Sequence, residues 1–226
     1  MDQSALFNSE RLRLLVISDQ HNSEQGLLWV HTLIREYSPD IVIHLGDIIS
    51  TRPASFARET LRSLVSANIP VLVIPGNNDP RENLPDIAKS GAVSLHENFF
   101  EFGGVKFVGR GGSNPTPFNT VFEEDDDSMA ASISSLVAPG DVWCLHAPVY
   151  GFRDRVPSGE HMGVKSFRSL LNSARPWVVL SGHIHDDWGI DVYKGTHFIN
   201  PGALLEMRAA IVDLTRPLVA VHFLHA

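Results

Sequence analysis

The sequence holds a single cysteine, Cys144, and no long apolar run, and each absence excludes a class of protein. One cysteine cannot form a disulfide within the chain. No stretch approaches the ~20 apolar residues that a membrane-spanning helix needs. The polar segment 1–10 also lacks the apolar core of a signal peptide. We therefore expect a soluble, cytoplasmic protein with no membrane partner.

Positive charge is also scarce, because 26 acidic residues outnumber the 18 lysine and arginine residues. The net charge of −8 argues against broad binding to nucleic acid, and against a nuclease with a basic groove. It does not argue against a phosphate substrate, because bound metal ions would reverse the local field. The length of 226 residues favours a single domain over residues 1–226.

Several short apolar runs, rich in valine, isoleucine and leucine, each end in a polar or glycine-rich turn. The runs cover residues 11–17, 41–45, 71–74, 142–145 and 178–180. Such runs are typical of strands buried on both faces. Helical spacing over Glu24–Tyr37 and Ser55–Asn68 separates the first three runs, which predicts parallel pairing. Two more helices are expected near Ser128–Val137 and Val164–Ser173.

The second half of the chain carries hairpin patterns instead. Gly103-Gly104 separates two short apolar segments, and Lys194-Gly195-Thr196 separates two more. The last two segments, 209–214 and 218–224, flank Thr215-Arg216-Pro217. We therefore expect this half to pair in a more antiparallel way, and the whole chain to form an α/β fold of stacked, helix-covered sheets.

Residues able to bind metal ions follow five of the predicted strands. They are Asp19 and His21, Asp47, Asn77, His146, and His183 with His185. Ligands of open α/β sheets gather at the carboxyl ends of the strands. Side chains two residues apart in an extended segment project to the same side, so each pair can reach one metal cluster. Together these residues predict a metal centre.

The donor set combines carboxylate, amide and imidazole groups. Mixed oxygen and nitrogen donors suit manganese, iron, zinc, nickel or cobalt rather than calcium. The lack of cysteine donors argues against a structural zinc site. Two ions about 3.5–4 Å apart, bridged by a carboxylate such as Asp47, would activate a bridging hydroxide for attack on phosphorus. The resulting formal charge of about +1 suits a phosphate ester.

The order of these residues forms a recognisable series of blocks. They are Asp19-Gln20-His21, Gly46-Asp47, Gly76-Asn77-Asn78-Asp79, His146 and Gly182-His183-Ile184-His185. This series resembles the calcineurin-like metallophosphoesterase superfamily. Asn200-Pro201-Gly202 is similar to the ending of the small prokaryotic members, so that the resemblance spans residues 14 to 203.

The resemblance implies a four-layer α/β/β/α sandwich with two mixed sheets, and a specific pair of metal sites. Metal one would bind Asp19, His21 and His185. Metal two would bind Asn77, His146 and His183. Asp47 would bridge the two ions, whose identity among manganese, iron, zinc, nickel and cobalt stays open.

Two positions depart from patterns common in the superfamily. Asn78 stands where many members have a histidine, and an amide cannot act as a general acid. Some small prokaryotic members that resemble this chain also lack that histidine and are mostly associated with phosphodiesters. Ser50 stands where the protein phosphatases have an aspartate. We therefore expect a small phosphodiester substrate, ahead of a phosphomonoester or phosphoprotein.

Catalytic roles follow from the same comparison. We predict that Asn78, with the metals, holds the nonbridging phosphate oxygens and that Asp79 positions the loop. Protonation of the leaving group would come from water or from another residue. His161 lies in the loop after His146 and is a candidate for substrate contact. The alternative is a non-catalytic interaction scaffold that keeps the fold.

Two other features have ordinary structural interpretations. His44 lies inside a predicted strand and is expected to be a hydrogen-bonded core histidine. The acidic run Glu123–Asp127 is expected to be a solvated loop that leads into a helix capped by Ser128.

Overall fold

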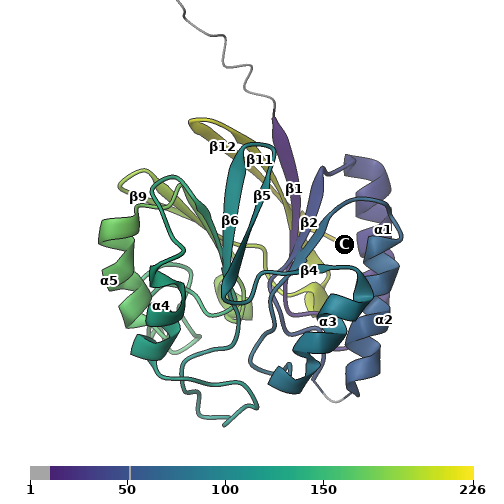
Figure 1. The fold of residues 1–226 in the computed structure, drawn as a ribbon, viewed down its shortest axis with the longest axis horizontal. Coiled ribbons are helices and arrows are strands. Elements are labelled where there is room, and N and C mark those ends of the chain that lie inside the picture. Colours follow the sequence, from purple (N-terminus) through teal and green to yellow (C-terminus); the bar gives the residue numbers. More distant parts are fainter. Residues whose placement is uncertain (1–10, 51) are drawn as a thin grey trace, which may run out of the picture.

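Two six-stranded sheets pack face to face in the computed structural model, which describes residues 11–50 and 52–226 (Figure 1). Residues 1–10, which we expect not to form a signal peptide, lie outside the described residues. The first sheet has the order β12 (Leu218–His225), β11 (Arg208–Thr215), β1 (Leu12–Ile17), β2 (Ile41–His44), β3 (Val71–Val73) and β4 (Val93–Ser94). The second has the order β5 (Asn98–Phe102), β6 (Val105–Arg110), β7 (Val142–Leu145), β8 (Val178–Ser181), β10 (Thr196–Asn200) and β9 (Gly189–Tyr193).

Helices cover the outer face of each sheet, as Figure 1 shows. The first sheet is covered by α1 (Glu24–Tyr37), α2 (Ala54–Val65) and α3 (Leu84–Ser90). The second is covered by α4 (Asp126–Ser134) and α5 (Lys165–Ala174). Short 3₁₀ turns occur at η1 (Arg81–Asn83), η2 (His185–Asp187) and η3 (Leu204–Glu206). The expected α/β/β/α sandwich is confirmed.

Strand β1 explains why four successive residues, 14–17, are all apolar. Leu14 and Val16 pack into the core between the sheets, whereas Leu15 and Ile17 pack against the helices. Alternate side chains of a strand point to opposite faces, so a strand covered on both faces needs apolar residues at every position. Polar side chains therefore collect at the strand ends, where the chain leaves the core.

Pairing in the first sheet agrees with the prediction, but pairing in the second is more parallel than expected. Strands β1, β2 and β3 are parallel. In the second sheet β6, β7, β8 and β10 are also parallel to one another. Among the described strands, antiparallel pairs occur only at its edges, between β5 and β6 and between β9 and β10. The helices α4 and α5 provide the long crossovers that parallel neighbours require.

The start of α4 corrects the interpretation of the acidic run. Asp125, and not Ser128, is the N-cap, and its carboxylate accepts a hydrogen bond from the Ser128 backbone N–H at 2.9 Å. Ser128 lies inside the helix and donates its hydroxyl to the same carboxylate. These bonds lower the pKa of Asp125. An ionised carboxylate at a helix N-terminus is also favoured by the helix dipole.

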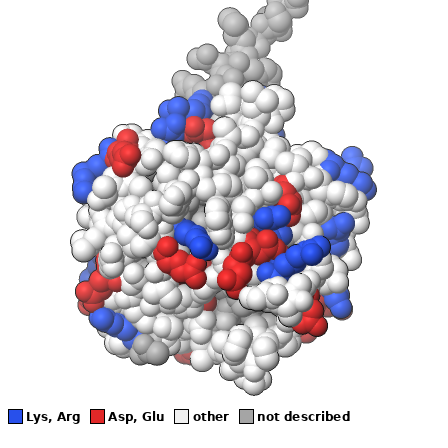
Figure 2. All heavy atoms as spheres, turned by 180° about the vertical axis from the view of Figure 1, so that it is seen from behind, with Lys and Arg blue, Asp and Glu red and all other residues white. Residues whose placement is uncertain are grey.

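The surface of the described residues shows no segregation of charge on the face turned away from Figure 1. Figure 2 shows lysine and arginine side chains interspersed with aspartate and glutamate on that face. No helix among the described residues has the length and apolar character needed to cross a membrane.

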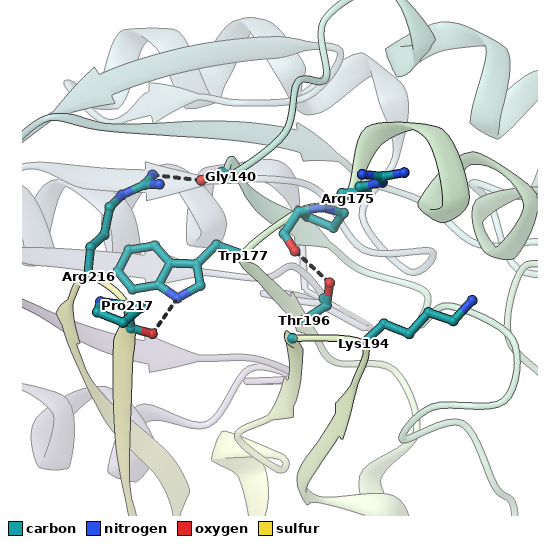
Figure 3. Close-up of a pocket in the computed structure, with 9 residues that line it drawn as sticks. Gly140, Arg175, Trp177, Lys194, Thr196, Arg216 and Pro217 are labelled. Carbon is teal, nitrogen blue, oxygen red and sulfur yellow. Dashed lines mark hydrogen bonds between the residues drawn. The ribbon is translucent and has the colours of Figure 1, made fainter.

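A pocket of about 280 Å³ opens at the amino ends of β7, β8 and β10. Figure 3 shows Arg216 lying along the Trp177 ring and donating to the Gly140 carbonyl oxygen, at 2.7 Å. Arg175 and Lys194 also line it. None of the predicted metal donors lines this pocket, because they follow the opposite, carboxyl ends of the strands.

Candidate metal centre

The loops after β1, β2 and β3 of the first sheet meet the loops after β7 and β8 of the second. The Asp19 N–H donates to the Gly46 carbonyl oxygen at 3.0 Å, and the His21 N–H donates to the Asp47 carbonyl oxygen at 2.9 Å. Between the sheets, the His183 N–H donates to Asp19 Oδ2 at 3.0 Å. Donors that are far apart in the sequence are therefore held at one edge of the sandwich.

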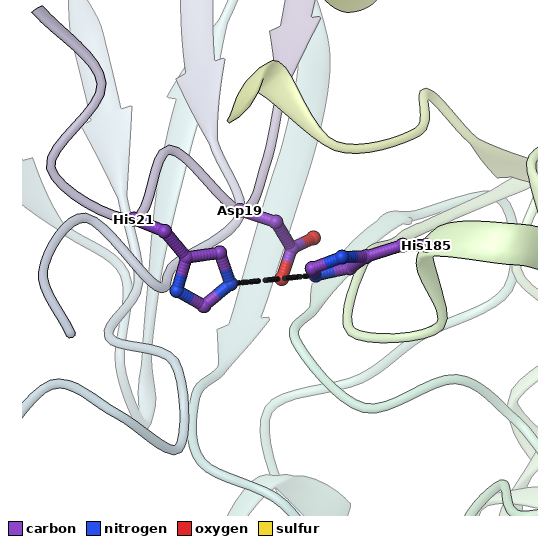
Figure 4. Close-up of side chains that lie close together, drawn as sticks. All are labelled: Asp19, His21 and His185. Atoms are coloured by element: carbon purple, nitrogen blue, oxygen red, sulfur yellow. Dashed lines mark hydrogen bonds and ion pairs between the residues drawn. The ribbon is translucent and has the colours of Figure 1, made fainter. Parts of the chain in front are cut away.

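Asp19, His21 and His185 form the first group of donors, here called the Asp19 cluster. Their ligand atoms lie within 4.8 Å of one another. Figure 4 shows the two imidazoles directed toward each other beside the carboxylate, with 3.3 Å between the two Nε2 atoms. Asp19 Oδ1 lies 3.3 Å from His185 Nε2 and 3.9 Å from His21 Nε2.

The Asp19 cluster fits a cation. Asp19 is 1% exposed, and its buried Oδ1 accepts no hydrogen bond from the described residues. Burial opposes ionisation of this carboxyl, but its contact with His185 and the charges of His146 and His185 hold the pKa of Asp19 well below its usual value. A buried anionic oxygen without a hydrogen-bond donor, flanked by imidazole nitrogens, is suited to a metal ion.

Asn77, His146 and His183 form the second group of donors, here called the His146 cluster. His146 Nδ1 lies 2.7 Å from the Leu45 carbonyl oxygen, which can only accept, so Nδ1 carries the proton. In neutral His146 the other nitrogen, Nε2, is then an acceptor. It faces another acceptor, Asn77 Oδ1, at 2.8 Å. Two facing acceptors are suited to a cation between them.

His183 completes this cluster. Its ring centroid lies 5.1 Å from that of His146, at an interplanar angle of 63°. Burial, together with the nearby His146, lowers the pKa of His183 to about 4. The ring is therefore neutral near pH 7, which is the form that binds metal.

Asp47 lies between the two clusters. Its Oδ2 is 3.6 Å from His21 Nε2, and its Oδ1 is 3.6 Å from His146 Nε2. One oxygen therefore faces each cluster, as a bridging ligand requires. Asn78 donates to the same carboxylate twice, from its backbone N–H to Oδ1 at 2.8 Å and from Nδ2 to Oδ2 at 2.7 Å.

Local backbone geometry aims these side chains. Asp19, His21, Asp47 and His183 all have positive φ, between 45° and 68°, which is uncommon outside glycine. Each such residue costs about 1–3 kcal/mol unless its surroundings hold it. The backbone hydrogen bonds between the strand-end loops provide that restraint. Strain concentrated on metal donors is typical of functional sites.

Two glycines beside the donors leave no room for a side chain. A Cβ at Gly76 would overlap the Asp47 carboxylate and backbone. A Cβ at Gly182 would overlap Ser18 and approach the Asp19 carboxylate. The glycines in the predicted blocks therefore permit the close approach of neighbouring loops.

Asp79 joins two of the loops. Its carboxylate accepts hydrogen bonds from the backbone N–H groups of Ile48, Ile49 and Gly76, at 3.2, 3.1 and 2.8 Å. Burial and the charge of Asp47 raise the pKa of Asp79, against the effect of these three donors. Asp79 thus connects the loop that carries Asp47 with the loop that carries Asn77.

His161 is part of a separate arrangement. Its Nδ1 bonds to the buried carboxylate of Asp154, which also accepts from the N–H groups of Gly151 and Gly163. These bonds hold His161 within its own loop rather than against a metal donor, so its contact with substrate stays a prediction. His44 is buried and bonds to Gly46 N and Gln20, as expected of a core histidine.

The acidic run contributes structure that sequence reasoning missed. Asp126 accepts a hydrogen bond from the Lys165 N–H, and Asp127 accepts one from the Ser166 hydroxyl, at the start of α5. Glu123 is half-buried, and its carboxylate is bonded within its own loop. The run leads into α4 with Asp125 and Asp127 exposed, as expected, so that only the predicted cap at Ser128 is wrong.

Two mixed sheets covered by helices, with candidate metal donors at the strand ends, match the fold of the metallophosphoesterases. The chain belongs to the calcineurin-like phosphoesterase family, whose model matches residues 12–187. It is accordingly a hydrolase of phosphate esters.

Similar proteins occur in archaea, bacteria and vertebrates. The uncharacterized protein MJ1162 of Methanocaldococcus jannaschii is 28% identical over 199 residues, which cover 84% of this chain and 88% of that protein. The structure of TT1561 from Thermus thermophilus has a TM-score of 0.76 at 16% identity, covering 94% of this chain and 99% of that one. A dimetal phosphatase from Danio rerio has a TM-score of 0.70 at 13% identity, covering 94% and 95%. These structural matches show a shared fold.

Proposed function

We propose that this protein is a dinuclear phosphoesterase that hydrolyses a small phosphate ester, with a phosphodiester preferred over a monoester. The observation that supports two ions is the position of Asp47, which presents one carboxylate oxygen to each donor cluster. The Danio rerio protein that shares the fold is named as a dimetal phosphatase, which agrees with this proposal.

The proposed ligands divide as the clusters do. Asp19, His21 and His185 would hold one ion, Asn77, His146 and His183 would hold the other, and Asp47 would bind both. When bound, the ions supply a water nucleophile of lowered pKa and Lewis-acid stabilisation of the phosphoryl oxygens. The mixture of carboxylate, amide and imidazole donors suits manganese, iron, zinc, nickel or cobalt.

Asn78 is the chain's own candidate for contact with the phosphoryl group. Its Nδ2 carries two hydrogens, and Asp47 accepts one of them. The second hydrogen is available to a phosphoryl oxygen. An amide cannot give up a proton to the leaving group, so the proposed reaction relies on water or on another side chain for that step.

The preference for a diester follows from charge. A phosphodiester carries one negative charge, whereas a phosphomonoester carries about 1.5 to 2 at pH 7. A protonated histidine at position 78 would help to balance the second charge, and Asn78 cannot. The centre therefore matches the monoanion better.

Asp47→Asn and His183→Ala test the proposed centre. We expect each to lower metal-dependent hydrolysis of an aryl phosphodiester by at least ~10³-fold, because Asp47→Asn removes the charge of the bridging group and His183→Ala removes a ligand where charge develops. His225→Ala, an exposed histidine on β12, provides the matched control and should retain wild-type rates. The assay uses metal-free protein reloaded with Mn²⁺, beside a chelated sample.

The outcomes discriminate between the hypotheses. Unchanged rates in either ligand variant would contradict the dinuclear centre. A faster wild-type rate on the corresponding aryl monoester would contradict the diester preference. Metal binding without hydrolysis across cyclic nucleotides, other diesters and monoesters would favour the non-catalytic scaffold.

A further inference from the structure

The amide of Asn77 has to be oriented before it can bind a metal through oxygen. Its Oδ1 lies 2.8 Å from His146 Nε2, and its Nδ2 donates to Thr120 Oγ1 at 3.0 Å. The two ends of an amide have nearly the same shape, so hydrogen-bond partners decide which end faces a site. Thr120 is the partner that the structure gives to Nδ2.

A threonine hydroxyl can donate or accept, and Glu123 removes this ambiguity. The Thr120 hydroxyl lies 2.6 Å from Glu123 Oε1, to which it donates its single hydrogen. The remaining lone pairs of Thr120 Oγ1 can then only accept a hydrogen bond. An amide nitrogen fits this position, and an amide oxygen would be repelled. The direction of each bond is thereby fixed from Glu123 through Thr120 to Asn77.

Glu123 is ionised, as this arrangement requires. Burial raises its pKa, but hydrogen bonds from Thr120 and Thr116 lower the pKa of Glu123 to about 2. The carboxylate accepts from the Thr120 N–H at 2.7 Å and from the Thr116 hydroxyl at 2.7 Å. An ionised carboxylate has no hydrogen to donate, so both hydroxyls must donate to it.

The same loop also holds the main chain of Asn77. The Phe122 N–H donates to the Asn77 carbonyl oxygen at 3.0 Å. On the outer side of the loop, Phe118 and Val121 are 82% and 65% exposed. Apolar burial of that side therefore does little to hold the loop, whereas the buried Phe122 holds its inner side and the hydrogen bonds at Glu123 fix the position of Thr120.

We infer that Thr120 and Glu123 are positioning residues for the second metal ion, because they turn the Asn77 amide so that its oxygen faces His146. The inference rests on the proposed dinuclear centre and adds two residues that would act on it from outside the ligand set. Loss of such an outer partner typically weakens metal binding by about 10–100-fold.

Thr120→Val is the main test, since valine keeps the shape and removes the hydroxyl. Thr120→Ser restores the hydroxyl. Thr116→Val is a matched control, because the Thr116 hydroxyl also bonds to Glu123 but is not the partner of the Asn77 amide. Glu123→Gln removes the charge that orients Thr120, and it provides a second route to the same contact if Thr120→Val does not fold.

The measurement is a Mn²⁺ titration of the metal-free full-length protein by calorimetry, with electron paramagnetic resonance to distinguish coupled from isolated Mn²⁺. We expect wild type to bind two ions. Thr120→Val should bind the first ion as wild type does and the second about 10–100-fold more weakly. Thr120→Ser and Thr116→Val should stay close to wild type, and Glu123→Gln should lie between them and Thr120→Val.

Several results would overturn the inference. One is binding of the second ion by Thr120→Val as tightly as by wild type, and another is wild-type affinity for that ion in Glu123→Gln. The inference also fails if Thr116→Val weakens binding of the second ion as much as Thr120→Val does, or if Thr120→Ser does not restore it. If wild type itself binds fewer than two ions, the proposed dinuclear centre fails and this inference fails with it. If wild type binds two ions and the variants do not differ, only the inference fails.

Discussion

The Asp19 cluster and the His146 cluster differ in charge and in exposure. The Asp19 cluster has a carboxylate of its own, and its two imidazoles are partly exposed, with 14% of the His21 and 30% of the His185 side chain accessible. In the His146 cluster, Asn77 and His146 are buried, at 3% and 0%, whereas His183 is partly exposed, and the cluster has no carboxylate apart from the shared Asp47.

This contrast indicates two ways of building a metal site. The Asp19 cluster attracts a cation through a buried carboxylate whose Oδ1 accepts no hydrogen bond from the described residues. The His146 cluster depends on orientation, because an imidazole and an amide bind only when the correct atom faces the ion. Leu45 fixes the His146 ring and Thr120 fixes the Asn77 amide. The first site should therefore respond more to charge and the second more to the positions of its neighbours.

The most direct way to break the comparison is to remove one imidazole from each cluster. We expect His146→Ala and His185→Ala each to bind one ion instead of two. Loss of a residue that only contacts a ligand weakens metal binding by ~10–100-fold. Loss of the ligand itself should weaken binding of that ion by at least this factor. Elemental analysis of the reloaded proteins would measure this. Retention of both ions by either variant would contradict the assignment of that histidine.

The same pair of variants separates structural from chemical roles. His146→Ala leaves the Leu45 carbonyl oxygen buried without its partner, which costs about 1–3 kcal/mol. His185→Ala removes a partly exposed ring and should lower the stability of the metal-free protein less. Thermal unfolding without metal would test this, and equal losses would contradict the contrast in burial.

Alanine at the crowded glycines should produce the next largest effect. Gly76→Ala and Gly182→Ala force a methyl group into neighbouring loops, which typically costs about 1–3 kcal/mol. For a chain of this length, each kcal/mol lowers the Tm by about 2–4 °C. Gly182→Ala should also disturb the Asp19 cluster through Ser18 and Asp19.

Gly159→Ala provides a control for the glycine variants. Unlike Gly76 and Gly182, Gly159 has a positive φ, at 89°, and no atom lies within 4 Å of an added Cβ. Its replacement should cost only the backbone strain, about 1–2 kcal/mol, and leave metal binding unchanged. Equal loss of metal binding in Gly159→Ala and Gly182→Ala would contradict the importance of crowding at the centre.

The smallest expected effect is a loss of stability at low pH that arises beside the Asp19 cluster. Burial lowers the pKa of His44 to about 3, and His44 supports the loop of the Asp19 cluster through Gln20. A histidine in the unfolded chain has a pKa near 6.5. Between about pH 6.5 and 3, His44 is therefore protonated in the unfolded state but not in the folded state. The free energy of unfolding falls as the pH drops through this range.

Tm values of the metal-free protein between pH 8 and pH 5 would measure this effect. His44→Gln removes the titrating group and should flatten the curve below pH 6.5. His31→Gln, on the outer helix α1, provides a control with a partly exposed ring and should flatten the curve less. A curve as steep in His44→Gln as in wild type would contradict this account.

The sequence was most informative where burial dictates residue type. Strands β1, β2 and β3 are covered on both faces, so their apolar runs are continuous and their ends are marked by Asp19, Asp47 and Asn77. Helix α1 was predicted with its observed bounds, since Ser23 caps its start and its apolar spacing is regular. These signals are local and can be read without the tertiary structure.

Long-range pairing and loop closure were harder to predict. The hairpin glycines at Gly103-Gly104 mark an antiparallel pair correctly, but the parallel pairing of β6 with β7 depends on distant segments. Thr120 and Glu123 carried no motif, because their roles arise only when the loop folds back on Asn77. The available signal for these roles was a glutamate three residues after a threonine. That spacing is common in turns, so it does not indicate a contact with Asn77.

Each proposed set of ligands takes donors from both sheets. Asp19 and His21 come from the first sheet and His185 from the second, whereas Asn77 comes from the first and His146 and His183 from the second. Neither sheet alone could assemble a complete site. Metal loading would therefore come late in folding, after the sheets have docked, and each bound ion would then act as a cross-link that resists their separation.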